Sequence, residues 1–141
     1  MTQRKKPEQS KELCEKIGLA MMEGQKLQFA LAYYYVVFHI VNSKWGKEKA
    51  KKRIEYYLSS SMEVIVDSIE DDAPLAPELF QEIVRFKEKR NWLTHEFVDE
   101  STLPLIQGKG FELYVQLMEE IIKLANRIIE KLNKVHKTLK T

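Results

Sequence analysis

The segment from Leu27 to Val41 (LQFALAYYYVVFHIV) constrains the fold most, because only Gln28 and His39 interrupt its apolar and aromatic residues. As a helix it is apolar on every face, and such a helix must be covered all round. We therefore predict that it forms the central helix of the core, or a core helix that also contacts a partner chain. Tyr33 to Tyr35 point about 100° apart, so core packing explains them better than one ligand-stacking platform. His39 is interpreted as a buried histidine with satisfied hydrogen bonds.

The rest of the chain has helical spacing of its apolar residues and no strand-like alternation. Helices are expected from Glu8 onward, over Lys47 to about Leu58, in a short segment through Met62 and Ile69, over Pro77 to about Phe97, and over Phe111 to about Leu139. The proline- and glycine-containing segments 70–77 and 99–110 are predicted connections, and residues 1–7 a disordered basic tail. The fold class is thus all-α: a single-domain, antiparallel bundle of four to five helices over residues 8–141.

Two glycines lie within the first predicted helix. Gly18 and Gly24 each cost about 1 kcal/mol relative to alanine in a helix interior. A close crossing with another helix would account for them, and so would a bend, and the sequence leaves both open at Gly24.

Composition narrows the class of protein. A length of 141 residues fits one domain, and 44% hydrophobic with 31% charged residues is ordinary for a soluble globular protein. The net charge of +2 gives no overall nucleic-acid signature, so any basic surface must be local. A single cysteine, Cys14, allows no internal disulfide and fits a reducing, cytoplasmic location. We expect no signal peptide and no membrane-spanning segment.

A charged residue interrupts the apolar stripe of the helix predicted over Pro77–Phe97. Arg90 falls on that stripe, and a guanidinium is costly to desolvate without an acceptor. Asn91 and His95 stand at i and i+4 and share one face, whereas Arg90 and His95 lie about 140° apart around the axis. Two copies of this helix facing each other would bring an arginine and a histidine closer to one ligand. The apolar members of the stripe are Leu79, Ile83, Phe86, Leu93 and Phe97.

The run Arg90-Asn91-x-x-x-His95 resembles the motif of the higher eukaryotes and prokaryotes nucleotide-binding (HEPN) family. In that family an arginine, often followed by a polar residue, precedes a histidine by four to six positions late in a helix of an all-α domain. The resemblance implies a HEPN-like bundle and a dimeric, metal-independent endoribonuclease without a cofactor. His95 would assist proton transfer, Arg90 would hold the phosphate, and Asn91 would orient the group it contacts. The implied partners are an RNA substrate, a second copy of the chain and an antitoxin protein, with no membrane and no DNA specificity.

One departure concerns the relatives that act as toxins beside a nucleotidyltransferase antitoxin. There a tyrosine two residues after the histidine is the modification target, and here that position is Phe97, which has no hydroxyl. Neutralisation by that route is therefore in doubt, which leaves another kind of antitoxin.

A second candidate surface is basic and aromatic. Its residues are Trp45, Lys47, Lys49, Lys51, Lys52 and Arg53, flanked by Tyr56 and Tyr57. Cations beside aromatic rings suit single-stranded RNA, in which phosphates contact Lys or Arg and bases stack. A solvated helix face is the alternative interpretation.

Three other readings complete the hypotheses. Arg90 and His95 also have a structural interpretation, in which the arginine binds an acid and the histidine caps carbonyl groups. The protein would then be a helical dimer that binds a protein partner or a nucleotide without turnover. The acids Asp67, Glu70, Asp71 and Asp72 are interpreted as a solvated loop, and no metal site is expected. Cys14 has no histidine nearby in the sequence to activate it as a nucleophile.

Overall fold

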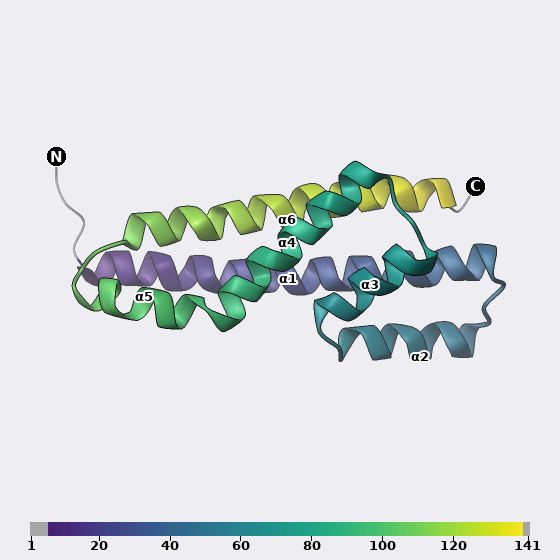
Figure 1. Cartoon of the computed structure of the whole chain (residues 1–141), viewed down its shortest axis with the longest axis horizontal. Coiled ribbons are helices and arrows are strands. Elements are labelled where there is room, and N and C mark those ends of the chain that lie inside the picture. Colours follow the sequence, from purple (N-terminus) through teal and green to yellow (C-terminus); the bar gives the residue numbers. More distant parts are fainter. Residues whose placement is uncertain (1–5, 140–141) are drawn as a thin grey trace.

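The computed structural model describes residues 6–139, and every regular element within that range is an α-helix (Figure 1). The helices are α1 (Lys6–Asn42), α2 (Lys47–Leu58), α3 (Met62–Asp72), α4 (Pro77–His95), α5 (Phe97–Ile106) and α6 (Phe111–Leu139). The all-α prediction is confirmed, with six helices in place of four to five. Lys6 and Pro7 belong to α1 and not to the predicted tail, while the prediction for residues 1–5 lies outside the described residues.

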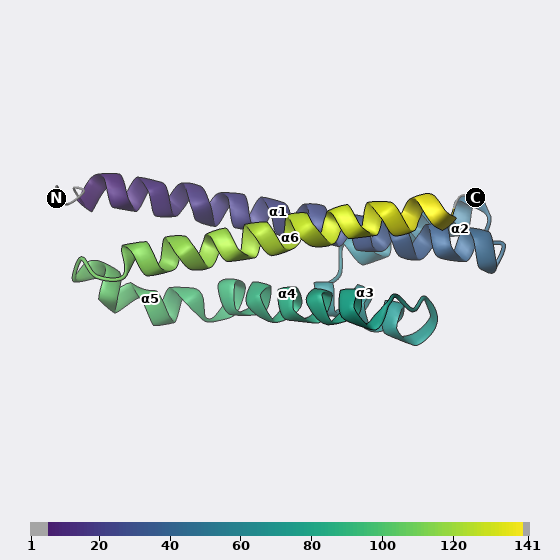
Figure 2. The same ribbon diagram turned by 90° about the horizontal axis from the view of Figure 1, so that it is seen from above.

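The two longest helices, α1 and α6, pack along each other and run parallel (Figures 1 and 2). Lys16 Nζ of α1 lies 3.4 Å from Glu119 Oε1 of α6, and further along both helices the rings of Tyr33 and His136 are 4.6 Å apart. Residue numbers therefore rise together on the two helices. The predicted antiparallel arrangement does not hold for this pair.

Helix α4 does run antiparallel to α6. Glu82, near the start of α4, pairs with Arg127, whereas Lys89, further along α4, lies 3.9 Å from Glu120. The hairpin of α2 and α3 causes this order, because it reverses the chain twice and α4 then starts at the end where α1 finished (Figure 1). Helices α4 and α5 lead the chain back to the end of the bundle where α1 begins, so α6 runs in the same direction as α1.

The core lies between α1, α4 and α6. Helix α6 is strongly amphipathic and buries one side along its whole length. Those buried residues are Phe111, Tyr114, Val115, Met118, Ile121, Leu124, Ala125, Ile128 and Leu132. The Leu27–Val41 segment forms the second half of α1 and contributes fully buried Leu27 and Leu31, as expected of a central helix. It is not covered all round within one chain, since Phe29, Tyr33 and Ile40 remain exposed.

Helix α1 is continuous through Gly24, so the close crossing accounts for this glycine and the bend does not. Gly24 is buried, and a Cβ atom there would lie 3.4 Å from Arg90 Nε and 3.6 Å from Phe86 Cζ of α4. The absence of a side chain lets α4 approach α1 at this point. A Cβ at Gly18 would meet nothing within 4 Å, and packing does not explain that glycine.

Two predicted connections are partly helical. Most of segment 99–110 belongs to α5, although Pro104 lies inside it. Burial overrides the proline signal here, because Phe97 and Ser101 stand one turn apart and both are buried, and the Phe97 ring contacts Tyr114 at 5.3 Å. Gly108 and Gly110 adopt positive φ values of 76° and 86° in the turn that follows. Likewise α3 extends to Asp72, which shortens the predicted loop 70–77.

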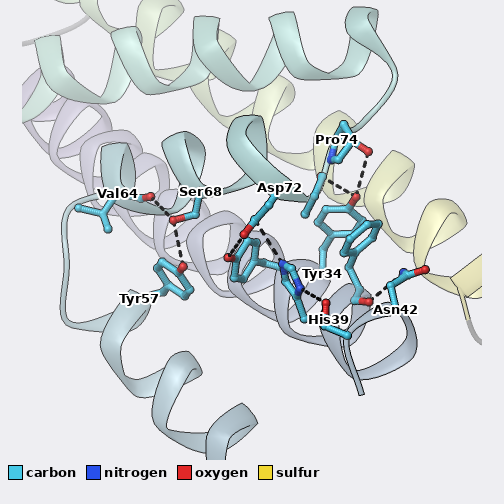
Figure 3. A network of polar contacts seen from close by, with 12 residues as sticks. Tyr34, His39, Asn42, Tyr57, Val64, Ser68, Asp72 and Pro74 are labelled. Carbon is cyan, nitrogen blue, oxygen red and sulfur yellow. Dashed lines mark hydrogen bonds and ion pairs between the residues drawn. The ribbon is translucent and has the colours of Figure 1, made fainter. Parts of the chain in front are cut away.

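A polar network ties the end of α1 to the end of α3 (Figure 3). His39 is buried, with Nδ1 2.8 Å from Ser43 Oγ and Nε2 3.2 Å from Asp72 Oδ1. The Tyr35 hydroxyl donates to Asp72 Oδ2 at 3.1 Å. Burial, and then the hydrogen bonds to Tyr57 and Asp72, raise the pKa of Tyr35. The interpretation of His39 as a satisfied core residue is confirmed, whereas Asp72 is a structural partner and not simply a solvated loop acid.

Neighbouring bonds extend this network and account for two more tyrosines. The Tyr34 hydroxyl donates to the Ala73 carbonyl at 2.9 Å, and burial raises the pKa of Tyr34 to about 12. The Tyr57 hydroxyl donates to Ser68 Oγ at 2.9 Å (Figure 3). These hydroxyls stabilise the junction of α1, α2 and α3. The core-packing interpretation holds for Tyr34 and Tyr35 but not for Tyr33, which is 38% exposed.

Glu82 should make stability depend on pH. Its carboxylate accepts hydrogen bonds from Lys131 and, at 2.8 Å, from Arg127 Nε, and these bonds hold the pKa of Glu82 below its ordinary value. A depressed pKa adds stability above the unfolded-state pKa, and this stability is lost as pH falls through the folded-state pKa. We expect Glu82→Gln to lower the free energy of unfolding by about 1 kcal/mol at pH 7 and to leave it nearly unchanged at pH 3. Urea unfolding from pH 7 to pH 3 measures this, with the exposed Glu88→Gln as control. Equal differences for Glu82→Gln at both pH values would contradict it.

Candidate functional site

Helix α4 carries the predicted catalytic residues and begins with Pro77 at its first turn, followed by Glu78. Proline suits this position because its missing N–H has no partner within the helix, and an acid there complements the helix dipole. The apolar stripe predicted from the spacing is confirmed, because its members on α4 are all buried. They are Leu79, Ile83, Phe86 and Leu93.

Arg90 is half-buried and turned toward α1. Its Nη1 donates to Gln28 Oε1 at 2.7 Å, and its Nε and Cδ lie closest to the position that a Cβ of Gly24 would take. Burial lowers the pKa of Arg90, although a guanidinium stays protonated in proteins. Among residues 6–139 no carboxylate lies within ion-pair distance of this guanidinium, so the buried side of the site holds a cation with a neutral acceptor only.

Gln28 is fixed by the end of α2. Its Nε2 donates to the Tyr57 carbonyl at 2.8 Å and to the Ser60 carbonyl at 2.7 Å. Since both amide hydrogens are used, Oε1 is left to accept from Arg90. Sequence reasoning did not assign Gln28 to the site, although a polar residue in an otherwise apolar run was the signal that could have identified it.

His95 and Asn91 are on the open side of α4. His95 is the last residue of the helix and is exposed, and Asn91 is exposed one turn before it. Within the described residues the side chain of His95 forms no hydrogen bond or ion pair. Within one chain the structure therefore does not bring Arg90 and His95 together. This agrees with their separation of about 140° around the helix axis.

A hollow between α4 and α6 was not anticipated from the sequence. It is lined by Arg85, Glu88, Lys89 and Trp92 of α4 and by Leu117 and Ile121 of α6. Trp92 Nε1 donates to Glu100 Oε2 at 2.5 Å. His95 follows Trp92 by three residues and continues the same side of α4. Charged residues on an exposed helix face are usually solvated, and the sequence carried no stronger signal for this hollow.

Only some of the predicted basic and aromatic residues, Trp45 and those of α2, lie together on one surface. Lys49 Nζ lies 4.7 Å and Arg53 Cζ 5.8 Å from the centre of the Trp45 ring, which is a cation–π arrangement. The Trp45 ring also stacks on His39 at 4.5 Å, so it is not a free platform for a base. Helical spacing puts Lys47 and Lys51 about 160° from Lys49 around α2.

Lys52 belongs to the same side of α2 as Lys49. It lines a shallow hollow with Glu48, Lys49, Arg53 and Tyr56. The Tyr56 ring is half-exposed and is the aromatic group most accessible to a base on this surface. Three of the five predicted cations, Lys49, Lys52 and Arg53, are thus brought together.

The fold and this site define an all-α bundle with an uncompensated arginine on α4. No family model, no curated protein and no solved structure matches the chain. Within residues 6–139 no three His, Cys, Asp or Glu side chains are grouped so that they could hold a metal ion. In the same range no helix is long and apolar enough to cross a membrane.

Proposed function

We propose that the protein is a metal-independent endoribonuclease of HEPN type. Arg90 would bind the phosphate that is attacked, His95 would assist proton transfer, and Asn91 would orient the phosphate or the imidazole. The α4 helices of two chains would face each other, so that Arg90 of one chain and His95 of the other contact one phosphate. A toxin or phage-defence effector restrained by an antitoxin protein would use such an activity.

The observation that carries the proposal is the half-buried Arg90 guanidinium, for which the amide oxygen of Gln28 is the only acceptor among residues 6–139. A buried arginine normally pairs with a carboxylate, because a desolvated charge without a counter-ion is costly. A phosphate would supply that missing negative charge, and the planar guanidinium can donate to two of its oxygens. Gln28 leaves further N–H donors of Arg90 available for this contact.

The chemistry needs only proton transfer and charge stabilisation. The 2′-hydroxyl of RNA attacks the adjacent phosphorus as it loses its proton, and the 5′-oxygen leaves as it gains one. Histidine can act as base or acid near neutral pH. Exposure at the end of α4 supports access of His95 to a large substrate. The cations Lys49, Lys52 and Arg53 of α2 would bind flanking phosphates.

A second candidate is a non-catalytic helical dimer that binds a protein partner or a nucleotide. The hydrogen bond between Arg90 and Gln28 favours it, because a structural arginine can be retained for that contact alone. In this case Arg90 would stabilise the crossing of α1 and α4, and its loss would lower stability and leave any RNA unaffected.

Replacement of Arg90 by methionine separates the two candidates. Arg90→Met completes the apolar stripe of α4 but leaves the buried Gln28 Oε1 without its donor, so we expect the free energy of unfolding to fall by about 1–3 kcal/mol and compare cleavage rates of the folded proteins. Cleavage of labelled RNA in EDTA should fall about 10²- to 10³-fold, the loss typical of one transition-state donor. Arg85→Met removes one positive charge from the same helix and should retain the activity. Cleavage at an unchanged rate in Arg90→Met, or none by the unmodified protein, would contradict the ribonuclease proposal.

A further inference from the structure

An apolar stripe follows the outer side of α1 for six turns, and residues 6–139 leave its side chains partly exposed; of these, Tyr33 also contacts the His136 ring of α6 at 4.6 Å. Its residues, called the α1 seam here, are Leu19, Met22, Phe29, Tyr33 and Ile40. They are 38–55% exposed, which is unusual for large apolar side chains in the middle of a protein's longest helix.

The seam follows the seven-residue pattern of helices that pair with one another. With Lys26 and Val36 included, its positions advance by 3, 4, 3, 4, 3 and 4 residues from Leu19 to Ile40. Positions a are Leu19, Lys26, Tyr33 and Ile40, and positions d are Met22, Phe29 and Val36. Such a pattern presents a continuous seam to a second helix.

The seam and the Arg90 contact are on different sides of α1. Gly24 and Gln28 contact α4, and at 100° per residue the seam positions Met22, Phe29 and Tyr33 lie about 100° to 180° from them. A helix bound to the seam would not touch the α4 site. The inference therefore goes beyond the proposed ribonuclease and does not depend on it.

We propose that the α1 seam binds the α1 seam of a second copy of this chain, in antiparallel orientation. The position of Lys26 decides the orientation, because it is the one charged residue of the seam. In a parallel pair Lys26 would face Lys26 of the partner at the same level, and two like charges would repel. In an antiparallel pair position a faces position d, so that Lys26 faces Val36 of the partner.

The antiparallel register matches the two seams at each level. Met22 faces Ile40 of the partner, and Phe29 faces Tyr33 of the partner, each contact occurring twice by symmetry. Phe29 and Tyr33 already stack within one chain, with ring centres 6.1 Å apart and planes 7° apart. The dimer centre would thus hold four aromatic rings.

Lys26 and the level of Val36 complete the match. Val36 is 1% exposed and already covered by its own chain, so the partner's Lys26 would lie over the exposed Tyr33 and Ile40 on either side of it. The aliphatic stem of Lys26 can cover these two side chains while its ammonium stays in water. Glu23 forms an ion pair with Lys26 at 3.1 Å within the chain, which keeps the charge compensated.

Sedimentation equilibrium tests the dimer. The unmodified protein should self-associate through the seam, and Phe29→Glu should raise the dissociation constant of that step about a hundredfold or more, because two central aromatic contacts are lost per seam pair. Dimers then become monomers, or, where the α4 helices also pair, tetramers become dimers. Leu103→Glu is the matched control: it replaces an apolar residue that is 63% exposed on α5 and should leave the dimer intact. Circular dichroism verifies that both variants stay folded. A monomeric unmodified protein, or equal dimerisation of Phe29→Glu, would overturn the proposal.

Cross-linking tests the orientation. In a Cys14→Ser background, chains with Met22→Cys are mixed with chains carrying Ile40→Cys and treated with a short bifunctional maleimide. The antiparallel register predicts covalent dimers in the mixture and few in either variant alone. In a parallel pair these positions would be about 27 Å apart along the axis, so homodimers of Met22→Cys alone, with no gain on mixing, would refute the antiparallel register.

Discussion

Replacement of His95 by alanine is expected to lower the rate of RNA cleavage about 10²- to 10⁴-fold, the usual contribution of a general acid or base. Stability should hardly change, because His95 is exposed at the end of α4 and its side chain forms no hydrogen bond or ion pair within residues 6–139. An exposed residue without contacts typically changes the unfolding free energy by about 0.5 kcal/mol or less. Initial rates with labelled RNA in EDTA and urea unfolding measure the two quantities.

His39 provides the contrasting control. It is buried and hydrogen-bonded to Ser43 and Asp72, so His39→Ala should lower stability by about 1–3 kcal/mol and leave the activity of the folded protein unchanged. Unchanged cleavage by His95→Ala would eliminate the catalytic assignment. Mixing His95→Ala with Arg90→Met chains adds a second test, because a site shared between two α4 helices would regain part of its activity. Pairing through the α1 seam alone would not restore it.

The sequence predicted the features that depend on helical periodicity. The apolar stripe of α4 and the position of Arg90 on it follow from residue spacing, whereas at Gly24 the cost of glycine in a helix left a close crossing and a bend open. Gln28 was visible as a polar residue in an apolar run. The contact of Gln28 with Arg90 could not be predicted, because the two residues lie 62 positions apart in the chain and meet only through the way α1 and α4 cross.

Tertiary packing decided what the sequence left unpredicted. The segment with Pro104 is typical of a connection, yet Phe97 and Ser101 are buried, and the Phe97 ring packs on Tyr114 of α6. The parallel arrangement of α1 and α6 arises because α2 and α3 form a hairpin, and local spacing carries no information on such reversals. Trp45 was predicted beside cations correctly, but its stacking on His39 could not be inferred from a sequence separation of six residues.

The crossing of α1 and α4 should contribute to the stability of the fold. Phe86 is fully buried there, and Phe86→Ala should lower the unfolding free energy by about 3–5 kcal/mol through lost burial and the cavity left behind. Circular dichroism during urea unfolding measures this change. An unfolding free energy within 1 kcal/mol of the unmodified protein would mean that the crossing is not tightly packed.

A second substitution shows whether the cavity lies where Gly24 and Phe86 meet. Gly24→Leu alone should destabilise by about 1–3 kcal/mol, because its side chain would displace Phe86 and Arg90. In combination with Phe86→Ala the leucine would occupy the vacated space, so the two losses should fall short of their sum by about 0.5–3 kcal/mol. Gly18→Leu is the matched control, since a Cβ there meets nothing within 4 Å and its effect should add to that of Phe86→Ala. If the losses from Gly24→Leu and Phe86→Ala also add without a shortfall, residues 24 and 86 are not in contact. The physical basis for the half-buried position of Arg90 would then be removed.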